Sequence, residues 1–459
     1  MTASLIGCVT YKPKPLSPTQ TASSIQNRRL DSPDLRKYIE EKLNDQGMSW
    51  PPGPWDFTML TLTAFYYHPD LDLARAKWGS VQGAIVTAGQ RPNPTVAVTP
   101  QYSVNPPSGA NPWILTIALD FPIETAGKRG YRIAQAKHLS EAARMDLATV
   151  AWQVRSRLRA SLVNLFAAEQ ALILQEKQLV IQEDLLRLME KRLVVGEVSQ
   201  PDLLQARLAL DQARLSLVDT KKKRIEARAD TAIALGLTAN AINEIVISFA
   251  FLENPPRPLP SAELREKALL NRPDILSSLS KYAASESALR LEIAKQYPDV
   301  NVGPNYEFDQ GQNKWGVGIS LTLPVLNQNQ GPIAEARARR EEAAALFLSL
   351  QAQVIGEIDR SLAGYQAALE KLDAVDSLLS EKEKEQQSTR AMFNAGEVDR
   401  LALLGAELEL HSVMLSRLEA LVQTKQSLGL LEDSLQYPLD ASGSILPDAE
   451  KRPRRMEEK

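Results

Sequence analysis

The chain has 459 residues with a formal net charge of −3, and 24% of its residues are charged. This balanced composition provides no basic surface field and argues against nucleic acid as a partner. Aromatic residues make up 6%, which is low for one large globular core, while Ala, Leu, Glu, Arg and Gln dominate the long segments, as in extended helices. No apolar run reaches the roughly 18 residues that a transmembrane helix needs, but membrane β-strands would give a much weaker signal.

The N-terminal segment is the first feature along the chain. Cys8, the single cysteine, follows a small residue at the end of 5–8, which resembles the processing box of bacterial lipoproteins. The charged and apolar regions that normally precede such a box are largely missing, so a stray free cysteine in a disordered leader is the alternative. Residues 9–33 are rich in Pro, Ser and Thr, which suits a tether. We expect residues 1–50 to form a lipoprotein-type leader and Pro-rich tether, with Cys8 as the lipid anchor.

A domain-sized repeat organises the rest of the chain. The stretch 192–210 returns 200 positions later at 392–410, with a shared Gly-Glu-Val sequence formed by Gly196, Glu197 and Val198 and again by Gly396, Glu397 and Val398. A period this long indicates a duplicated unit rather than a solenoid of short repeats. After the leader we expect a first repeat, a Pro-rich linker, a second repeat and a disordered polar tail, at 51–253, 254–260, 261–437 and 438–459.

Each repeat is predicted to open with one helix, at roughly 56–90 and 261–296, followed by two segments of alternating polarity. These segments lie at about 94–104, 113–121, 299–308 and 315–323. One apolar face, one small or polar face and this length are typical of membrane β-strands. Aromatic residues lie towards the ends of the apolar faces, as in membrane girdles: Tyr102, Trp113, Phe121, Tyr306, Phe308 and Trp315. The alternative, a sheet packed on the helices, leaves the very long helices unexplained.

Two long helical hairpins are predicted after the strands. The first has helices at about 128–194 and 201–235 with its turn at Gly196, and the second has helices at about 332–394 and 399–434 with its turn at Gly396. The longest helix would extend about 100 Å and needs lateral packing against other helices. Four strands cannot close a barrel, and an open sheet edge is unfavourable in lipid. The strands can therefore enter a membrane only in an oligomer, and a trimer leaves more room for a conduit than a dimer.

These features together resemble the TolC family of outer-membrane efflux ducts over residues 56–437. The resemblance rests on the duplicated helix–strand–strand–long-helix unit and on the two Gly-Glu-Val hairpins. It also rests on Gly89–Pro94 and Phe121–Arg129, which look most like the heavy-metal, CzcC-like branch associated with RND pumps.

The resemblance implies a mainly α fold with membrane β, in which a homotrimer forms a 12-stranded outer-membrane β-barrel continued by a periplasmic α-barrel. It implies a periplasmic adaptor (membrane fusion protein) and an inner-membrane pump, of the RND type, as partners. Residues 195–199 and 395–399 would form the periplasmic tip that contacts the adaptor, through the two Gly-Glu-Val sequences.

The resemblance also points to a gate near the second turn. Family members often carry two aspartates there that ring the closed entrance, but this chain has Ala402 and Gly405 at those positions. The first-repeat counterparts, Asp202 and Gln205, are the candidate gate residues. The alternative is that Asp202 only interacts with the N-terminal dipole of the helix that follows Pro201.

No catalytic chemistry is apparent in the sequence. His68, His138 and His411 lie far apart and in no metal-ligand spacing. Phosphate-binding loops and Cys or Ser nucleophile motifs do not occur. We expect no enzyme activity, no cofactor and no metal site, and we expect His68, which precedes Pro69, to be a helix-end residue.

The favoured function is a passive outer-membrane exit duct of a tripartite efflux system in a Gram-negative cell. It would export metal ions, drugs or other small molecules and would open when the adaptor separates the hairpins at the tip. The outer-membrane duct of a type I protein secretion system is an alternative that the sequence does not separate. A periplasmic coiled-coil adaptor or scaffold is the alternative from another class, although two hairpins and four membrane-length strands argue against it.

Overall fold

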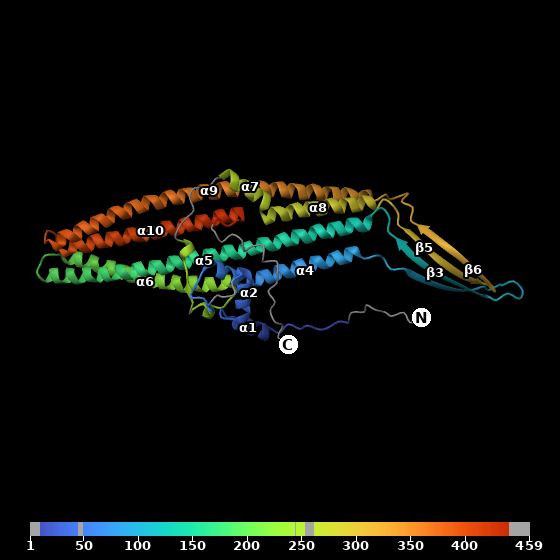
Figure 1. Ribbon diagram of the computed structural model, residues 1–459, viewed down its shortest axis with the longest axis horizontal. Coiled ribbons are helices and arrows are strands. Elements are labelled where there is room, and N and C mark those ends of the chain that lie inside the picture. Colours follow the sequence, from blue (N-terminus) through green and yellow to red (C-terminus); the bar gives the residue numbers. More distant parts are fainter. Residues whose placement is uncertain (1–9, 45–48, 244, 253–260, 440–459) are drawn as a thin grey trace.

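The structure is a computed structural model that describes residues 10–44, 49–243, 245–252 and 261–439. The anchor predicted at Cys8, the linker predicted at 254–260 and all but the first two residues of the predicted tail lie outside the described residues. The chain forms a long rod (Figure 1). A β-sheet extends from one end of the rod, helices make up the rest, and two hairpin turns lie at the far end.

The four predicted strands form one antiparallel sheet in the order β2-β3-β5-β6. Their bounds are β2 (Thr95–Tyr102), β3 (Trp113–Ile123), β5 (Val300–Asp309) and β6 (Gln312–Leu321). Ile117 of β3 pairs with Val98 of β2 and with Tyr306 of β5. Tyr306 in turn pairs with Trp315 of β6. Because side chains alternate along a strand, this register gathers the apolar residues on one face and the small and polar residues on the other.

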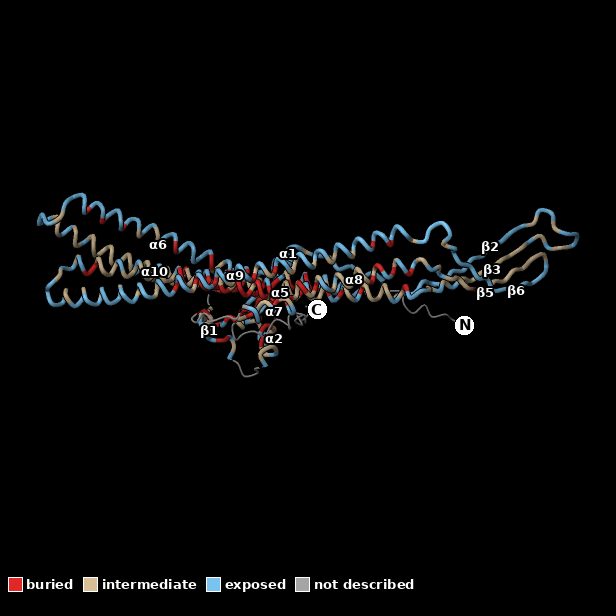
Figure 2. Tube along the Cα trace, turned by 90° about the horizontal axis from the view of Figure 1, so that it is seen from above, coloured by how far each residue is buried: buried red, intermediate tan, exposed pale blue. Residues whose placement is uncertain are grey.

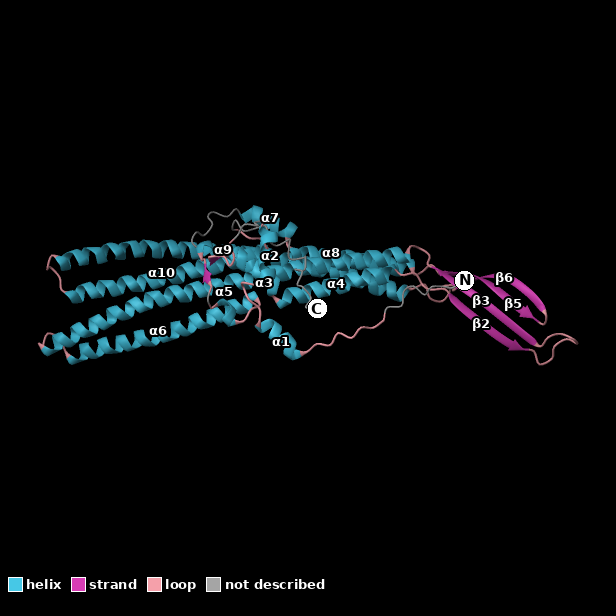
Figure 3. Cartoon of the chain, turned by 60° about the horizontal axis from the view of Figure 1, so that its bottom comes forward, coloured by secondary structure: helices cyan, strands magenta, loops and turns pink. Residues whose placement is uncertain are grey.

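The sheet does not pack its apolar face on the helices, so the alternative of a helix-covered sheet is wrong. It projects beyond the helix ends (Figure 3). Every residue of β2 and β6 is exposed, including Val96 at 65% and Val317 at 71%. A continuous apolar face of this kind indicates a surface that lipid or another protein covers.

Each predicted opening helix is in fact two helices, because a proline interrupts it. α3 (Phe57–Tyr67) is followed by α4 (Pro69–Gly89), and α7 (Ser261–Asn271) is followed by α8 (Pro273–Ala294). His68 and Arg272, which precede the prolines, are extended, since a proline ring disfavours the helical conformation of its predecessor. His68 is a helix-end residue, as predicted, and its Nδ1 accepts a hydrogen bond from the N–H of Asp70 at 3.2 Å.

Part of the N-terminal segment packs into the folded core, which corrects the tether predicted for residues 1–50. Two helices, α1 (Pro18–Gln26) and α2 (Pro33–Leu43), begin at Ser-Pro pairs, a sequence favoured at helix N-termini. Leu35 and Ile39 of α2 are fully buried in the main hydrophobic cluster. Arg28 donates hydrogen bonds to the carbonyl oxygens of Tyr67 and Gly236 at 2.9 and 2.8 Å. The segment therefore fastens onto the ends of α3 and of the helix that precedes Gly236.

The long hairpins confirm the predicted bounds to within two residues. α5 (Lys128–Val194) and α6 (Gln200–Leu235) form the first hairpin, and α9 (Gln330–Asn394) and α10 (Arg400–Leu435) form the second. On the sheet side of the rod the main packing order is α4-α5-α8-α9, and on the tip side it is α6-α5-α10-α9. Both orders follow that of the sheet, so one long edge of the chain carries β2, α4 and α6 and the other carries β6 and α9.

The main hydrophobic core lies in the middle of the rod, where buried residues concentrate (Figure 2). Short elements complete it, namely β1 (Pro54–Trp55), which is parallel to β4 (Val246–Ile247), and the 3₁₀ helices η1 (Ala239–Ile242) and η2 (Ala250–Leu252). The hairpin tips and the sheet lie outside this core. Within the described residues, every helix is too short or too polar to cross a membrane.

Candidate functional site at the hairpin tips

The two hairpin turns share one backbone geometry. Gly196 and Gly396 have φ angles of +78° and +77°, a left-handed conformation that favours glycine at the end of a helix. The Gly196 N–H donates to the Leu193 carbonyl at 3.0 Å and the Glu197 N–H donates to the Arg192 carbonyl at 2.9 Å, and the second turn repeats both bonds at the same distances. The predicted adaptor-contact residues beside the glycines are exposed glutamates and half-buried valines: Glu197, Val198, Glu397 and Val398.

Asp202, a predicted gate residue, caps the N-terminus of α6. Its Oδ2 accepts hydrogen bonds from the Ser199 N–H at 3.0 Å and from the Ser199 hydroxyl at 2.5 Å, and the Asp202 N–H donates to Ser199 Oγ at 3.4 Å. This reciprocal capping box pairs N–H groups that the helix itself leaves free. The Ser199 hydroxyl and then its N–H lower the pKa of Asp202. Helix capping thus explains why a carboxylate occupies position 202. A gating role for Asp202 and for the exposed Gln205 stays a prediction.

Ion pairs join the two hairpins at their tips. Asp399, the N-cap of α10, accepts the Ala402 N–H with Oδ1 at 2.8 Å, while its Oδ2 lies 2.7 Å from Nη2 of Arg192 on the first hairpin. The hydrogen bond from Ala402 and then the contact with Arg192 lower the pKa of Asp399. A second pair joins Arg400 Nη2 to Asp184 Oδ2 at 3.5 Å. Each hairpin thus contributes one cation and one carboxylate to the link.

The sequence does not predict that these four residues pair, although Asp399 lies within the predicted tip 395–399 and the repeat carries a signal for all four. Each occupies a position at which the two copies differ in charge or polarity. The differing positions are Asp184 against Lys384, Arg192 against Met392, Asp399 against Ser199 and Arg400 against Gln200. The positions predicted as the gate, Asp202 and Gln205, are a helix cap and an exposed amide.

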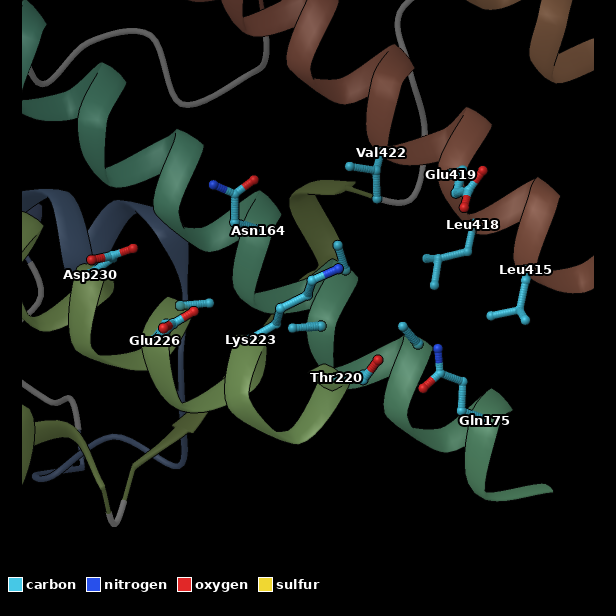
Figure 4. A pocket seen from close by; sticks show the side chains of 14 residues that line it. Asn164, Gln175, Thr220, Lys223, Glu226, Asp230, Leu415, Leu418, Glu419 and Val422 are labelled. Carbon is cyan, nitrogen blue, oxygen red and sulfur yellow. The ribbon is translucent and has the colours of Figure 1, made fainter. Parts of the chain in front are cut away.

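A groove of about 480 Å³ separates α6 from α10 between the core and the tips (Figure 4). Small α5 side chains form part of its lining: Ala167, Ala168 and Ala171. Lys223 of α6 and Glu419 of α10 also line it. The hairpins therefore meet here chiefly through α5 and α10. Between the core and the tip ion pairs, this leaves α6 separated from the second hairpin.

The predicted girdle residues lie mainly at the end of the sheet that is remote from the helices. Tyr102 pairs with Trp113 at a ring-centroid separation of 5.2 Å, and Tyr306 pairs with Trp315 at 4.9 Å. Phe308 lies at the same end, whereas Phe121 lies nearer the helices, opposite Val302. The aromatic content of the apolar face is therefore uneven, with one rich end and one sparse end.

The Phe121–Arg129 sequence builds the junction between sheet and helices. The Nζ atom of Lys128, a buried side chain, donates to the Tyr297 carbonyl at 2.6 Å and to Asp299 Oδ1 at 2.7 Å. The Thr125 N–H donates to the same Asp299 oxygen at 2.9 Å. These bonds tie the start of α5 in the first repeat to the start of β5 in the second, so the sheet and the helical layer are joined across the repeats.

Replacing Asp202 with Ala is expected to loosen the first turn of α6, because the Ser199 N–H and hydroxyl lose their acceptor. Amide hydrogen exchange at residues 199–203 should become several-fold faster. Gln205→Ala is the control and should leave exchange unchanged. Unchanged exchange in Asp202→Ala together with altered channel conductance would instead assign the carboxylate to the entrance.

Comparison with known proteins places the fold in a family. The family model described as outer membrane efflux protein matches residues 64–237 and 264–435, one match in each repeat. The chain is 24% identical over 363 residues to the cobalt-zinc-cadmium resistance protein CzcC of Cupriavidus metallidurans, covering 78% of this chain and 84% of that protein. It is 23% identical over 248 residues to the cation efflux system protein CusC of Escherichia coli K12, covering 50% of this chain and 54% of CusC.

Solved structures show the same architecture. A crystal structure of CusC superposes with a TM-score of 0.66 at 18% identity, covering 85% of this chain and 94% of that chain. The outer-membrane channel OprN gives 0.65 at 19% identity, covering 96% and 100%. These matches confirm the predicted family and its two-repeat fold. The chain belongs to the outer membrane efflux protein family, and it is an outer-membrane efflux channel that reaches into the periplasm rather than an enzyme.

Proposed function

We propose that three copies of the chain close into a ring that serves as a passive exit duct through the outer membrane. The observation that carries this proposal is the four-stranded sheet with an exposed apolar face and two edge strands, β2 and β6, that each pair on one side only. In lipid, unpaired backbone groups at such edges are costly unless another strand pairs with them. Three sheets together supply twelve strands, enough to close a barrel around a conduit.

The polar face of the sheet would line that conduit. Thr99 of β2, Asn305 of β5 and Ser320 of β6 lie on the face opposite the apolar one. Side chains of this kind keep a lumen wet without forming a tight binding site. Cargo would therefore pass without being bound, and the driving energy would come from a partner.

The helical layer offers edges that match those of the sheet. Ring closure would join the β6 and α9 edge of one copy to the β2, α4 and α6 edge of the next, a heterologous contact of the kind that generates rings. Apolar side chains on α6 recur at spacings of three, four and seven residues, the pattern of a helix that packs on another helix. They are 58–66% exposed in the single chain: Leu204, Leu208, Leu215, Val218 and Ile225.

Leu208→Glu is expected to weaken the ring, because it would bury a carboxylate between α6 and the neighbouring copy. The trimer fraction in detergent, measured by light scattering, should fall several-fold. Ala209→Glu is the matched control, since it adds the same charge at the adjacent exposed position of α6. An equal loss of trimer in both variants, or in neither, contradicts the proposed use of this edge.

The tip ion pairs are the best candidate for the gate. Arg192–Asp399 and Arg400–Asp184 hold the two hairpins of one chain together at the end that a periplasmic adaptor would reach. The groove between α6 and α10 supports a gate at the tips, because it separates α6 from the second hairpin between the core and the tips. An adaptor that engages the turns and replaces these contacts would let the hairpins move apart and open the entrance.

Breaking one pair should favour the open channel. In planar bilayers, Arg192→Gln and Asp399→Asn are each expected to raise the open probability roughly ten-fold. A trimer contains three copies of the weakened pair, and their small contributions to the stability of the closed state add together. Asp399→Asn keeps the helix cap, since Asn is also a good N-cap residue, so it removes only the charge.

The control for the gate is Arg207→Gln, which removes an ion pair of 3.2 Å with Glu190 inside the first hairpin. This variant should conduct like the unmodified chain. Opening that is equal in all three variants would contradict the tip pairs as the gate. A chain that forms no pore under any condition would contradict the duct itself.

We infer that metal cations are the cargo and that a periplasmic adaptor and an RND-type inner-membrane pump are the partners. Two relatives, CzcC and CusC, are named for cobalt-zinc-cadmium resistance and for cation efflux. A second class, small organic molecules, is supported by a relative from Pseudomonas aeruginosa that is named for pyoverdine export and is 23% identical over 334 residues.

Deleting the gene from its host is expected to lower tolerance to cobalt, zinc or cadmium several-fold, measured as the minimal inhibitory concentration. The unmodified chain should restore tolerance and Leu208→Glu should not, whereas Ala209→Glu should. Unchanged metal tolerance together with reduced export of an organic molecule would contradict metal cations as the cargo and favour the second class. The proposed duct would still hold in that case.

A further inference from the structure

The seam between α5 and α10 contains a buried ionic cluster that joins the two repeats. Glu432 Oε2 accepts hydrogen bonds from Arg155 Nη1 at 3.1 Å and from Arg159 Nη1, and its Oε1 accepts the Leu439 N–H at 3.0 Å. Arg155, Arg159 and Glu432 are at most 5% exposed. The one carboxylate at the centre of the cluster is thus fully engaged by two arginines and a backbone N–H.

The neighbouring carboxylate is also engaged. Asp433 accepts the Trp152 indole N–H with Oδ1 at 2.8 Å and the Ser156 hydroxyl with Oδ2 at 2.6 Å. Both of its oxygens therefore have donors from α5. Every oxygen of these two carboxylates thus already accepts at least one hydrogen bond, and neither carboxylate accepts one from Lys425.

Lys425, two turns earlier on α10, adds a third positive charge to the seam. It is 1% exposed, and no described residue accepts a hydrogen bond from its Nζ. The Nε of Arg159, which is 4% exposed, likewise lacks an acceptor among the described residues. Lysine and arginine side chains are donors only, so neither can satisfy the other.

The lysine remains mostly charged at neutral pH even in this setting. Burial and then the positive charge of Arg159 lower the pKa of Lys425 to about 8. At pH 7 the seam therefore contains a buried ammonium beside the Arg159 guanidinium, which already shares Glu432 with Arg155, and no described carboxylate is bonded to Lys425. A buried charge of this kind is strongly unfavourable unless an opposite charge accompanies it.

We propose that Lys425 and Arg159 bind a small monovalent anion, such as chloride, between α5 and α10. The two unsatisfied donors come from different helices and from different repeats, so one anion would connect the halves of the chain. A monovalent ion matches the single uncompensated charge that Lys425 adds beyond the engaged cluster. A small ion is required because the site is enclosed, as the exposure of both side chains shows.

The site lies where a connection between repeats would matter. Asn164, which follows Arg159 by little more than one turn, accepts a hydrogen bond from Gln426 at 3.2 Å. Beyond it, towards the tips, the groove begins and α6 parts from α10. The anion would thus strengthen the last part of the seam before the hairpins separate. This inference concerns the stability of a single chain and holds whether or not the proposed cargo and gate are correct.

The test compares chloride with gluconate, which is too large for an enclosed site. Thermal unfolding of the detergent-solubilised protein at pH 7 should occur a few degrees higher in sodium chloride than in sodium gluconate of equal ionic strength. Crystals grown in sodium bromide should show an anomalous difference peak between Lys425 Nζ and Arg159 Nε. Equal melting temperatures in the two salts, or no bromide peak, would overturn the proposal.

Three variants assign the effect to this lysine. Lys425→Met removes the charge at similar size and should abolish the difference between the salts. Lys425→Glu supplies a carboxylate to Arg159 and should likewise be insensitive to chloride. Lys371→Met is the matched control, because this lysine is exposed on α9 and donates to Gln423 at 2.8 Å, so the salt effect should persist. A salt effect that survives in Lys425→Met contradicts the site.

The pH dependence provides an independent readout that needs no variant. Without an anion, the lowered pKa of Lys425 makes the folded state less stable below about pH 8, and stability recovers as pH rises towards the ordinary lysine value of 10.5. An anion binds only the protonated lysine, so the chloride effect should be full below pH 8 and fade above it. A chloride effect that stays constant up to pH 10 would indicate ordinary salt stabilisation and overturn the proposal.

Discussion

The buried contact of Arg155 and Arg159 with Glu432 is the constraint on which the architecture depends. It joins α5 of the first repeat to α10 of the second, inside a seam where all three side chains are nearly inaccessible to water. Replacing such a cluster by apolar residues often costs little, but removing one member leaves the others charged and unpaired, which costs about 3–5 kcal/mol. The contact therefore specifies one register of α10 against α5 more than it adds stability.

That register is transmitted along the rod to the sheet. α5 runs without interruption from the seam to the junction, where Lys128 meets Asp299 at the start of β5. Since the helical layer and the sheet share one order, an α10 placed correctly on α5 also places the second repeat's strands beside the first repeat's. A shift of one residue between β3 and β5 would turn half of the apolar face towards the polar side. The alignment of Ile117 with Tyr306 thus depends on helix contacts far from the sheet.

The features that the sequence predicted well are those governed by local chemistry. Gly196 and Gly396 were recognisable as turns because a helix that ends in a left-handed residue favours glycine. The strands were recognisable because apolar and polar side chains that alternate along a segment lie on opposite faces when the segment is extended. Pro69 and Pro273 also act locally, yet each opening helix was predicted as continuous, since the apolar pattern on either side resembles that of one helix.

Features that depend on contacts distant in sequence were not predictable in the same way. The composition of residues 9–33 predicts a tether that extends to residue 50, whereas Leu35 and Ile39, four positions apart on one face of α2, are buried in the main core. The partners of Arg192 and Asp184 are set by how two hairpins lie side by side, and no local pattern encodes that. Only the comparison of the two copies, position by position, carries a trace of it.

Burial divides the ionic contacts of this chain into two kinds with opposite uses. The seam on Glu432 is buried, so breaking it is costly and the two repeats stay joined there. The tip pairs are only partly buried, with Arg192 and Asp399 at 23% and 47% exposure, and a pair in contact with solvent contributes only about 0.5 kcal/mol. Two such pairs in each of three chains would add to about 3 kcal/mol, which keeps the open state of a two-state gate below about one part in a hundred. Contacts with the proposed adaptor would exceed that amount without approaching the cost of opening the seam, so under the proposed gate the chain would open at the tips and stay a fixed wall at the seam.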